Sequence, residues 1–144
     1  MDTSAINQDY YWMAKAIRLA QRGLYTTSPN PRVGCVIVSP DNHCVGEGAH
    51  LEAGTPHAEV HALKQAGELA KGATAYVTLE PCVMCVGAML HARIARLVFG
   101  AHDPKSGAAG SVLDLCDESA LNHRIEVNGG LGSQSRMTGP CDLT

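Results

Sequence analysis

Two short stretches of the chain carry side chains that bind soft metal ions and move protons. His57 and Glu59 stand two residues apart, and Cys82 and Cys85 form a C-x-x-C pair preceded by a proline. One imidazole and two thiolates fill three positions of a tetrahedral zinc ion and leave the fourth open to water, which is typical of a catalytic rather than a structural zinc site. The sequence therefore predicts that His57, Cys82 and Cys85 bind one Zn2+ ion per chain.

The combined pattern indicates a reaction as well as a metal. H-x-E followed by P-C-x-x-C is typical of zinc-dependent deaminases of nucleobases, although neither half is specific alone. The two-residue step from His57 to Glu59 does not place both side chains on one helical face, so we expect Glu59 beside the activated water rather than on the metal. A carboxylate there can take a proton from water, deliver it to a ring nitrogen and protonate the departing ammonia. Glu59 is the predicted catalytic residue of a zinc-dependent hydrolase.

The elements that must position these residues follow from hydrophobic periodicity. Residues 9–22 are predicted to form an amphipathic helix with Met13, Ile17 and Ala20 on its buried face. The further elements are predicted as strands at 33–38 and 43–50 joined by a turn, a helix at 58–70, a strand at 75–79, a helix at 83–94 and a strand at 95–100. Strand-helix-strand crossovers give parallel neighbours. This order predicts an α/β fold, a three-layer α/β/α sandwich around a mixed central sheet of about five strands.

The C-terminal part has weaker patterns. Residues 103–111 are predicted as a loop, 111–119 as a short helix and 123–128 as a last strand. From residue 129 to residue 144 glycine, serine and proline dominate without an apolar period, which predicts a flexible tail. We therefore expect one zinc deaminase domain over residues 1–128.

Composition limits the partners and the cellular compartment. The chain has 144 residues, 45% hydrophobic and 17% charged, with a net charge of −3, and we expect a cytoplasmic protein because no secretory signal or membrane-spanning run is present. No long basic run provides a general footprint for nucleic acid. Of the six cysteines, Cys35 is predicted to be a buried core residue. Cys44, Cys116 and Cys141 have no assigned role.

Two parts of the chain resemble two groups of one superfamily. Residues 9–82, which include SPNPRVGCVIV, VGEGAH and AGTPHAEVHAL, resemble the deaminase domain of the bifunctional riboflavin-biosynthesis deaminase/reductase. Residues 78–130, which include TLEPCVMCVGAM and GAHDPKSGAAGS, are similar to the bacterial tRNA adenosine deaminase. Both groups have the cytidine-deaminase-like fold. The resemblance implies that fold here, and it also implies a homodimer.

The resemblance and the loop chemistry suggest which residues contact the substrate. In the riboflavin-type enzymes the residues matching Asn30 and His50 line the substrate site, and Ala58 is placed there with them. An amide can read a ring edge, and an imidazole can donate a hydrogen bond to a phosphoribosyl group. Lys105 and Ser106 lie in a glycine-rich loop, where backbone N–H groups can approach a phosphate. These five residues are the predicted substrate-binding set.

The substrate itself has several candidates. The first is a diaminohydroxyphosphoribosylaminopyrimidine of the riboflavin pathway, a small phosphorylated pyrimidine that suits the acidic net charge. The second is adenosine in tRNA, which Cys85 favours because it follows Cys82 without the Ser-His and Pro-Pro loop of the riboflavin-type enzymes. His50 and the SPNPR turn depart from the tRNA type. A free nucleobase or nucleoside, such as guanine or cytidine, is a third candidate, and a zinc-stabilised inactive domain is a fourth.

Overall fold

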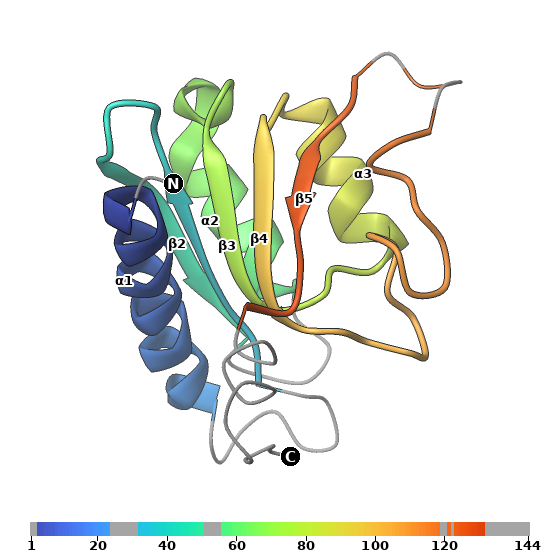
Figure 1. The fold of residues 1–144 in the computed structure, drawn as a ribbon, viewed down its shortest axis with the longest axis horizontal. Coiled ribbons are helices and arrows are strands. Elements are labelled where there is room, and N and C mark those ends of the chain that lie inside the picture. The colour runs from blue at the N-terminus through green and yellow to red at the C-terminus, as the bar shows by residue number, and fades with distance from the viewer. Residues whose placement is uncertain (1–2, 24–31, 51–55, 119–120, 122, 132–144) are drawn as a thin grey trace.

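A mixed five-stranded sheet forms the centre of the protein (Figure 1). The structure, a computed structural model, describes residues 3–23, 32–50, 56–118, 121 and 123–131. The strands are β1 (Gly34–Val38), β2 (Cys44–Ala49), β3 (Thr74–Leu79), β4 (Arg96–Ala101) and β5 (Glu126–Asn128), in the spatial order β2-β1-β3-β4-β5. Strand β1 is antiparallel to β2 and β3, whereas β3, β4 and β5 are parallel.

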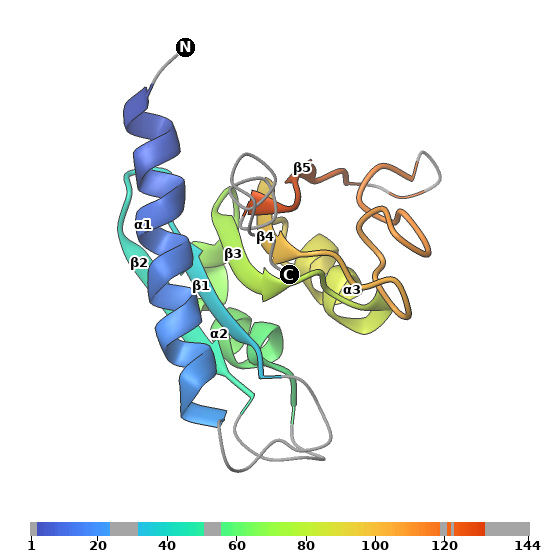
Figure 2. The same cartoon turned by 60° about the horizontal axis from the view of Figure 1, so that its bottom comes forward.

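Three helices cover the two faces of the sheet. Helix α1 (Thr3–Ala20), extended by a 3-10 turn at Gln21–Gly23, packs on one face. Helices α2 (Ala58–Ala66) and α3 (Val83–His91) pack on the other, and a 3-10 turn at Gly67–Ala70 follows α2. Figures 1 and 2 show α1 separated from α2 and α3 by the strands. The predicted three-layer sandwich around a mixed five-stranded sheet is confirmed.

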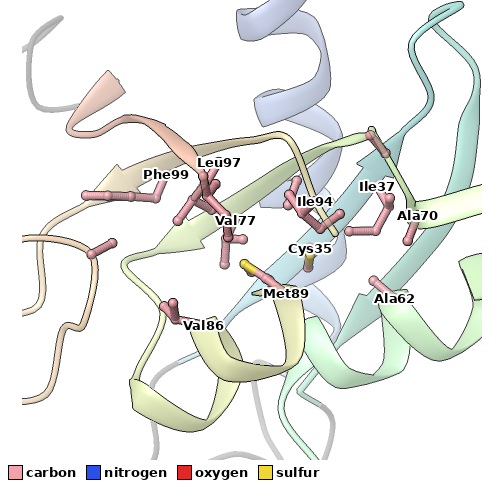
Figure 3. Packing of buried hydrophobic residues seen from close by; sticks show 14 of the residues in the cluster. Cys35, Ile37, Ala62, Ala70, Val77, Val86, Met89, Ile94, Leu97 and Phe99 are labelled. Atoms are coloured by element: carbon pink, nitrogen blue, oxygen red, sulfur yellow. The ribbon is translucent and has the colours of Figure 1, made fainter. Parts of the chain in front are cut away.

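Alternation along the strands fills both sides of the sheet. On β1, Cys35 and Ile37 face α2 and α3, while Val36 and Val38 face α1. The same two-residue period continues on β3 and β4, as expected for strands buried on both faces. Figure 3 shows the side of the core under α2 and α3, where Met89 lies among strand residues. The predicted burial of Cys35 is confirmed.

Helix α1 differs from the prediction in its start and in one side chain. It begins at Thr3 rather than at residue 9. Met13 and Ala20 are buried as predicted, but Ile17 is 47% exposed. The buried stripe is centred on Ala16, and Ile17 lies about 100° further around the helix, because an α-helix has 3.6 residues per turn. The placement of Ile17 in the core was therefore wrong.

The segment after β4 is a loop where a short helix was predicted. The described part of that stretch, residues 111–118, forms turns, and an isolated bridge pairs Ala109 with Asp114. The backbone N–H of Leu115 donates to the carbonyl oxygen of Ala108 rather than to that of Ser111, which the i−4 bond of a helix would require. The predicted last strand is present as β5, which is shorter than expected.

The packed chain continues past β5 for three residues. Gly129 lies against the Phe99 ring, and Leu131 packs on the core beneath α1. Asn30, Cys141 and residues 132–144 of the predicted tail lie outside the described residues. Within the described part of the chain, no helix is both long enough and apolar enough to cross a membrane.

Candidate active site

The site lies at one edge of the sheet, where two parallel strands end. Leu79 of β3 is paired with Ala101 of β4, so the segments that leave both strands start side by side. One segment leads through Cys82 into α3, and the other forms the loop that begins at His102. The first turn of α2 reaches the same edge with His57. Ligand sites of open α/β sheets occupy this position, at the carboxyl ends of the strands.

The three predicted zinc ligands meet in space. His57 Nδ1 lies 3.3 Å from Cys85 Sγ and 3.7 Å from Cys82 Sγ, and the three donor atoms lie within 4.8 Å of one another. Tetrahedral zinc with ordinary Zn–N and Zn–S bonds separates a nitrogen from a sulfur ligand by about 3.6 Å. The donor set and its spacing therefore fit a zinc ion with one coordination position left open.

Local backbone geometry explains why these side chains converge. His57 and Cys82 are the N-cap residues of α2 and α3, each with extended φ and ψ, which turn their side chains back across the helix start. Cys85 lies one turn into α3, so its sulfur returns to the same point. Helix α2 can approach β2 closely because Gly48 has no Cβ atom. A Cβ atom there would collide with the carbonyl oxygen of Ala58.

Glu59 lies inside the same site. It is only 4% exposed, and burial raises its pKa to about 6. The Cys85 thiol donates a hydrogen bond to its carboxylate, which partly offsets that rise. Within the described residues the metal-ligating group is limited to His57, Cys82 and Cys85. A carboxylate with a pKa near neutrality is suited to taking up and releasing a proton.

Burial also acts on two of the ligands. The pKa of the Cys85 thiol is raised well above its ordinary value by burial, by Glu59 and by Cys82. Burial and the neighbouring His50 lower the pKa of His57, so its neutral, metal-binding form is favoured. The start of a helix ordinarily favours the thiolate form of a nearby cysteine. For Cys85 the opposite holds until a metal displaces the proton.

A cavity of about 230 Å³ opens onto the zinc ligands. Its polar lining comes from His50, His57, Glu59, Glu80, Cys82, Asp103 and Ser106. His50 follows β2, is 5% exposed, and meets the His57 ring edge to face at a centroid distance of 5.7 Å. Its Nδ1 lies 3.4 Å from the carbonyl oxygen of Pro56. The structure thus brings His50 to the cavity as the resemblance implied.

The other predicted substrate-binding residues have different positions. Ala58 is buried under Gly48 and is not among the residues that line the cavity. Ser106 lines the cavity, whereas the neighbouring Lys105 is exposed and does not. The backbone N–H groups of both residues donate to Asp103 Oδ1, at 3.0 and 3.3 Å. These N–H groups are already bound, so the expected backbone cradle for a phosphate is closed.

Sequence reasoning missed Glu80 and Asp103. Glu80 directly precedes the Pro-Cys pair, and its buried carboxylate accepts hydrogen bonds from the loop after β4. Asp103 lines the cavity and organises the turn that carries Ser106. Because Glu80 directly follows the buried strand that ends at Leu79, its burial could have been predicted. Its hydrogen-bond partners lie more than 20 residues further along the chain, so no local pattern indicates them.

Comparison with known proteins assigns the family. Residues 6–101 match the cytidine and deoxycytidylate deaminase zinc-binding region. The chain belongs to this family. The predicted zinc cofactor and the predicted class of zinc-dependent deaminase are confirmed by this match and by the ligand cluster.

Within the family, the chain is similar to riboflavin-biosynthesis proteins. It is 53% identical over 130 residues to the riboflavin biosynthesis protein RibD of Escherichia coli, covering 86% of this chain and 34% of that protein. It is 48% identical over 109 residues to a diaminohydroxyphosphoribosylamino-pyrimidine deaminase of Buchnera aphidicola (subsp. Acyrthosiphon pisum), covering 72% of this chain and 74% of that one. The chain thus spans about a third of the length of the Escherichia coli relative and about three quarters of the length of the Buchnera relative.

Solved structures agree on the fold. A RibD structure from Acinetobacter baumannii matches with a TM-score of 0.77 and 45% identity, over 91% of this chain and 38% of that one. A deaminase from a study of A-to-I editing by tRNA:A34 deaminases matches with a TM-score of 0.74 and 32% identity, over 84% of this chain and 98% of that one. The predicted cytidine-deaminase-like fold is confirmed.

Proposed function

We propose that this protein hydrolytically removes an exocyclic amino group from a diaminohydroxyphosphoribosylaminopyrimidine, releasing ammonia. The observation that carries the proposal is the cluster of His57, Cys82 and Cys85 beside a cavity that His57, Cys82 and the buried Glu59 line. Similarity to the Buchnera deaminase, over most of the length of that protein, supports the choice of ring. We take residues 1–128 as the single domain that performs the reaction.

The chain's own residues supply most of the chemistry. His57, Cys82 and Cys85 would hold zinc, which supplies an activated water near neutral pH. Glu59 would accept one proton of that water at its carboxylate and pass it to a ring nitrogen. It would then take the second proton from the hydroxyl group added to the ring and deliver it to the amino group, which leaves as ammonia. Burial of Glu59 and of the Cys85 sulfur keeps competing solvent away from this proton path.

The cavity also supplies groups that can hold the ring. His50 presents an imidazole beside His57, and Ser106 and Asp103 supply a hydroxyl and a carboxylate to the same lining. A ribosylaminopyrimidine offers ring N–H donors and ribose hydroxyls to such groups. Asn30 and Lys105 remain proposed contacts, with Lys105 at the exposed rim where a phosphate would meet solvent.

Adenosine in tRNA is the second candidate. The direct Cys82–Cys85 spacing and the match to nearly the whole tRNA:A34 deaminase chain favour it. The net charge of −3 argues against it, because binding to a polyanion gains affinity from clustered lysine and arginine. In that case the base would be flipped out of a loop into the same cavity.

Ammonia release would separate these candidates. The zinc-loaded protein is given the riboflavin-pathway ribotide, an adenosine-bearing tRNA anticodon stem-loop, and free guanine or cytidine. We expect kcat/KM for the ribotide to be at least about 100-fold higher than for the other substrates. Preference for the stem-loop would replace the first candidate with the second, and silence with all substrates would favour an inactive zinc domain.

We also propose the homodimer that the resemblance implies. Light scattering coupled to size-exclusion chromatography measures the mass directly. A mass of twice 15.2 kDa is expected, and a mass of one chain at all concentrations would reject the dimer.

A further inference from the structure

Glu80 is a fully buried carboxylate between the end of β3 and the loop of residues 102–111, here called the wall loop. Its side chain has no exposed surface. Glu80 Oε1 accepts the Asp103 N–H at 3.1 Å, and Oε2 accepts the N–H groups of Ala109 and Ser111 at 3.0 Å each. The Ser111 hydroxyl also donates to Oε1. A buried carboxylate with this many donors holds both ends of the loop to one point.

The wall loop forms part of the lining of the same cavity that His57 and Cys82 line. It contributes Asp103 and Ser106 to the lining. Asp103 in turn accepts the Ser106 hydroxyl at 2.8 Å and the Ser106 N–H at 3.3 Å. The position of Glu80 therefore fixes the backbone of Asp103, and the side chain of Asp103 fixes Ser106.

Glu80 is also part of the segment that carries a zinc ligand. Pro81 and Cys82 follow it directly, and the carbonyl oxygen of Pro81 accepts the Ala108 N–H at 2.8 Å. The backbone N–H of Glu80 donates to Ala101 at the end of β4. Hydrogen bonds from the wall loop thus reach both the Glu80 carboxylate and the backbone of Pro81, which leads to the zinc ligand Cys82.

The backbone of the wall loop packs closely against the Glu80 carboxylate. A Cβ atom at Gly107 would collide with the Glu80 carboxylate, so the loop backbone lies directly on it. His102 Nδ1 lies 3.5 Å from Glu80 Oε1 on the exposed side. Ala108 and Ala109 of the loop are buried in the apolar core, so the polar contacts of Glu80 act together with that packing.

We propose that Glu80 is a positioning residue for substrate binding: it sets the distance between the wall of the cavity, formed by Asp103 and Ser106, and the zinc ligands. Glu80 is not part of the metal-ligating cluster, and although it lines the cavity, its carboxylate oxygens accept hydrogen bonds from the wall loop, through which it acts. The inference rests on the proposed function only in taking the cavity as the substrate site. Whether the wall loop is held by Glu80 can be measured without any substrate.

The test compares Glu80→Gln with Asp117→Asn as the matched control. Gln has nearly the shape of Glu, but its amide nitrogen cannot accept the backbone N–H groups that the carboxylate accepts. Asp117 is an exposed residue whose side chain pairs with Arg124, and its substitution removes the same charge outside the cavity. Both variants are prepared with zinc, and zinc content and Tm are recorded first.

Amide hydrogen exchange is the substrate-independent readout. In Glu80→Gln, exchange of the Asp103, Ala109 and Ser111 amides should rise about tenfold or more relative to the amides of α2 and α3, because their acceptor is weakened. In Asp117→Asn the ratio should not change. Equal acceleration throughout the protein would mean that Glu80 only contributes to global stability and would overturn the proposal.

Steady-state kinetics is the second readout. With the ribotide, or with whichever substrate the wild type turns over, KM should rise about tenfold in Glu80→Gln with kcat reduced much less. Ser111→Ala keeps the carboxylate and removes one donor, so it should raise KM in the same direction by a smaller factor. It also serves if Glu80→Gln fails to fold. Unchanged KM in the variants that fold overturns the proposal, whereas a wild type inactive on the ribotide contradicts only the proposed substrate.

Discussion

His57 Nδ1 lies 3.3 Å from Cys85 Sγ, although the two residues are 28 positions apart in the chain. This contact joins the start of α2 to the first turn of α3 across the edge of the sheet. In the sequence, the 3-10 turn at Gly67–Ala70 and strand β3 lie between the two helices. A metal at this point would therefore connect two elements that pack on the same face.

Replacing Glu59 separates metal binding from turnover. In Glu59→Gln zinc should remain at one ion per chain, while kcat falls by about 10³-fold, because the amide cannot take up the proton. Ammonia release and zinc content are measured on the same preparation. Glu47→Gln is the control, since Glu47 pairs with Lys15 on the surface. Turnover near the wild-type rate in fully zinc-loaded Glu59→Gln would remove Glu59 from the mechanism.

The raised pKa of Glu59 predicts a pH-dependent stability in the zinc-depleted protein. Its pKa is about 6 in the folded chain against an ordinary value of 4.5, so the folded state binds the proton more tightly than the unfolded state. Stability therefore falls as the pH rises from 4.5 to above 6. The free energy of unfolding of the wild type, minus that of Glu59→Gln, should fall by about 2 kcal/mol between pH 4.5 and 7.

Urea unfolding at a series of pH values provides these free energies. The difference between the two proteins should level off above pH 7, where Glu59 is ionised in both states. A difference that rises or stays constant between pH 4.5 and 7 would mean that burial does not hold the Glu59 proton.

A buried ion pair fastens α1 to the sheet. Arg96 donates to Asp9 Oδ1 at 2.9 Å and to Oδ2 at 2.7 Å, and the Tyr76 hydroxyl donates to Oδ1 at 2.7 Å. Asp9→Ala should lower the free energy of unfolding by about 3 kcal/mol, because it leaves Arg96 without its partner in a mostly buried position. Glu47→Gln, which breaks the more exposed pair with Lys15, should cost less than about 1 kcal/mol. Similar losses in the free energy of unfolding of both variants would show that the Asp9 network stabilises the protein no more than an exposed ion pair does.

Two glycines give opposite predictions for substitution by alanine. A Cβ atom at Gly34 would collide with the carbonyl oxygen of Ala16 in α1, so Gly34→Ala should destabilise the protein by about 3 kcal/mol. Gly87 in α3 has open space around it, and Gly87→Ala should stabilise the helix by up to about 1 kcal/mol. Thermal unfolding measures both changes. A tolerated Gly34→Ala would contradict the close packing of α1 on β1.

Much of the fold was predictable because its signals are local. The strands β1, β3 and β4 are short apolar runs, and α2 and α3 follow regular helical periods, so their order and layers could be predicted. Ile17 was misplaced because its apolar character fits the helical period, whereas the actual stripe is centred on Ala16. The helix predicted at 111–119 is absent because backbone N–H groups in this stretch bind carbonyl oxygens earlier in the loop, as Leu115 does with Ala108, instead of their i−4 partners.

Only part of the site was predictable from the sequence. The ligand cluster around His57 could be found because zinc requires particular residue types at fixed spacings. The part of the cavity lining formed by Asp103 and Ser106 could not be predicted, since it is held by Glu80 through contacts between residues far apart in the sequence. The expected phosphate cradle at Lys105 assumed free backbone N–H groups, which the Asp103 side chain in fact binds. Spacing identifies the reaction centre better than it identifies the groups that select the substrate.

The zinc content of the purified protein tests the claim that His57, Cys82 and Cys85 bind one zinc ion. Inductively coupled plasma mass spectrometry on wild type and His57→Ala, after dialysis against a weak chelator, measures metal per chain. The claim predicts about one zinc per wild-type chain and close to none in His57→Ala, because the two remaining thiols lose the imidazole that completes the donor set. A wild-type chain without zinc, or a His57→Ala variant with as much zinc as the wild type, would contradict it.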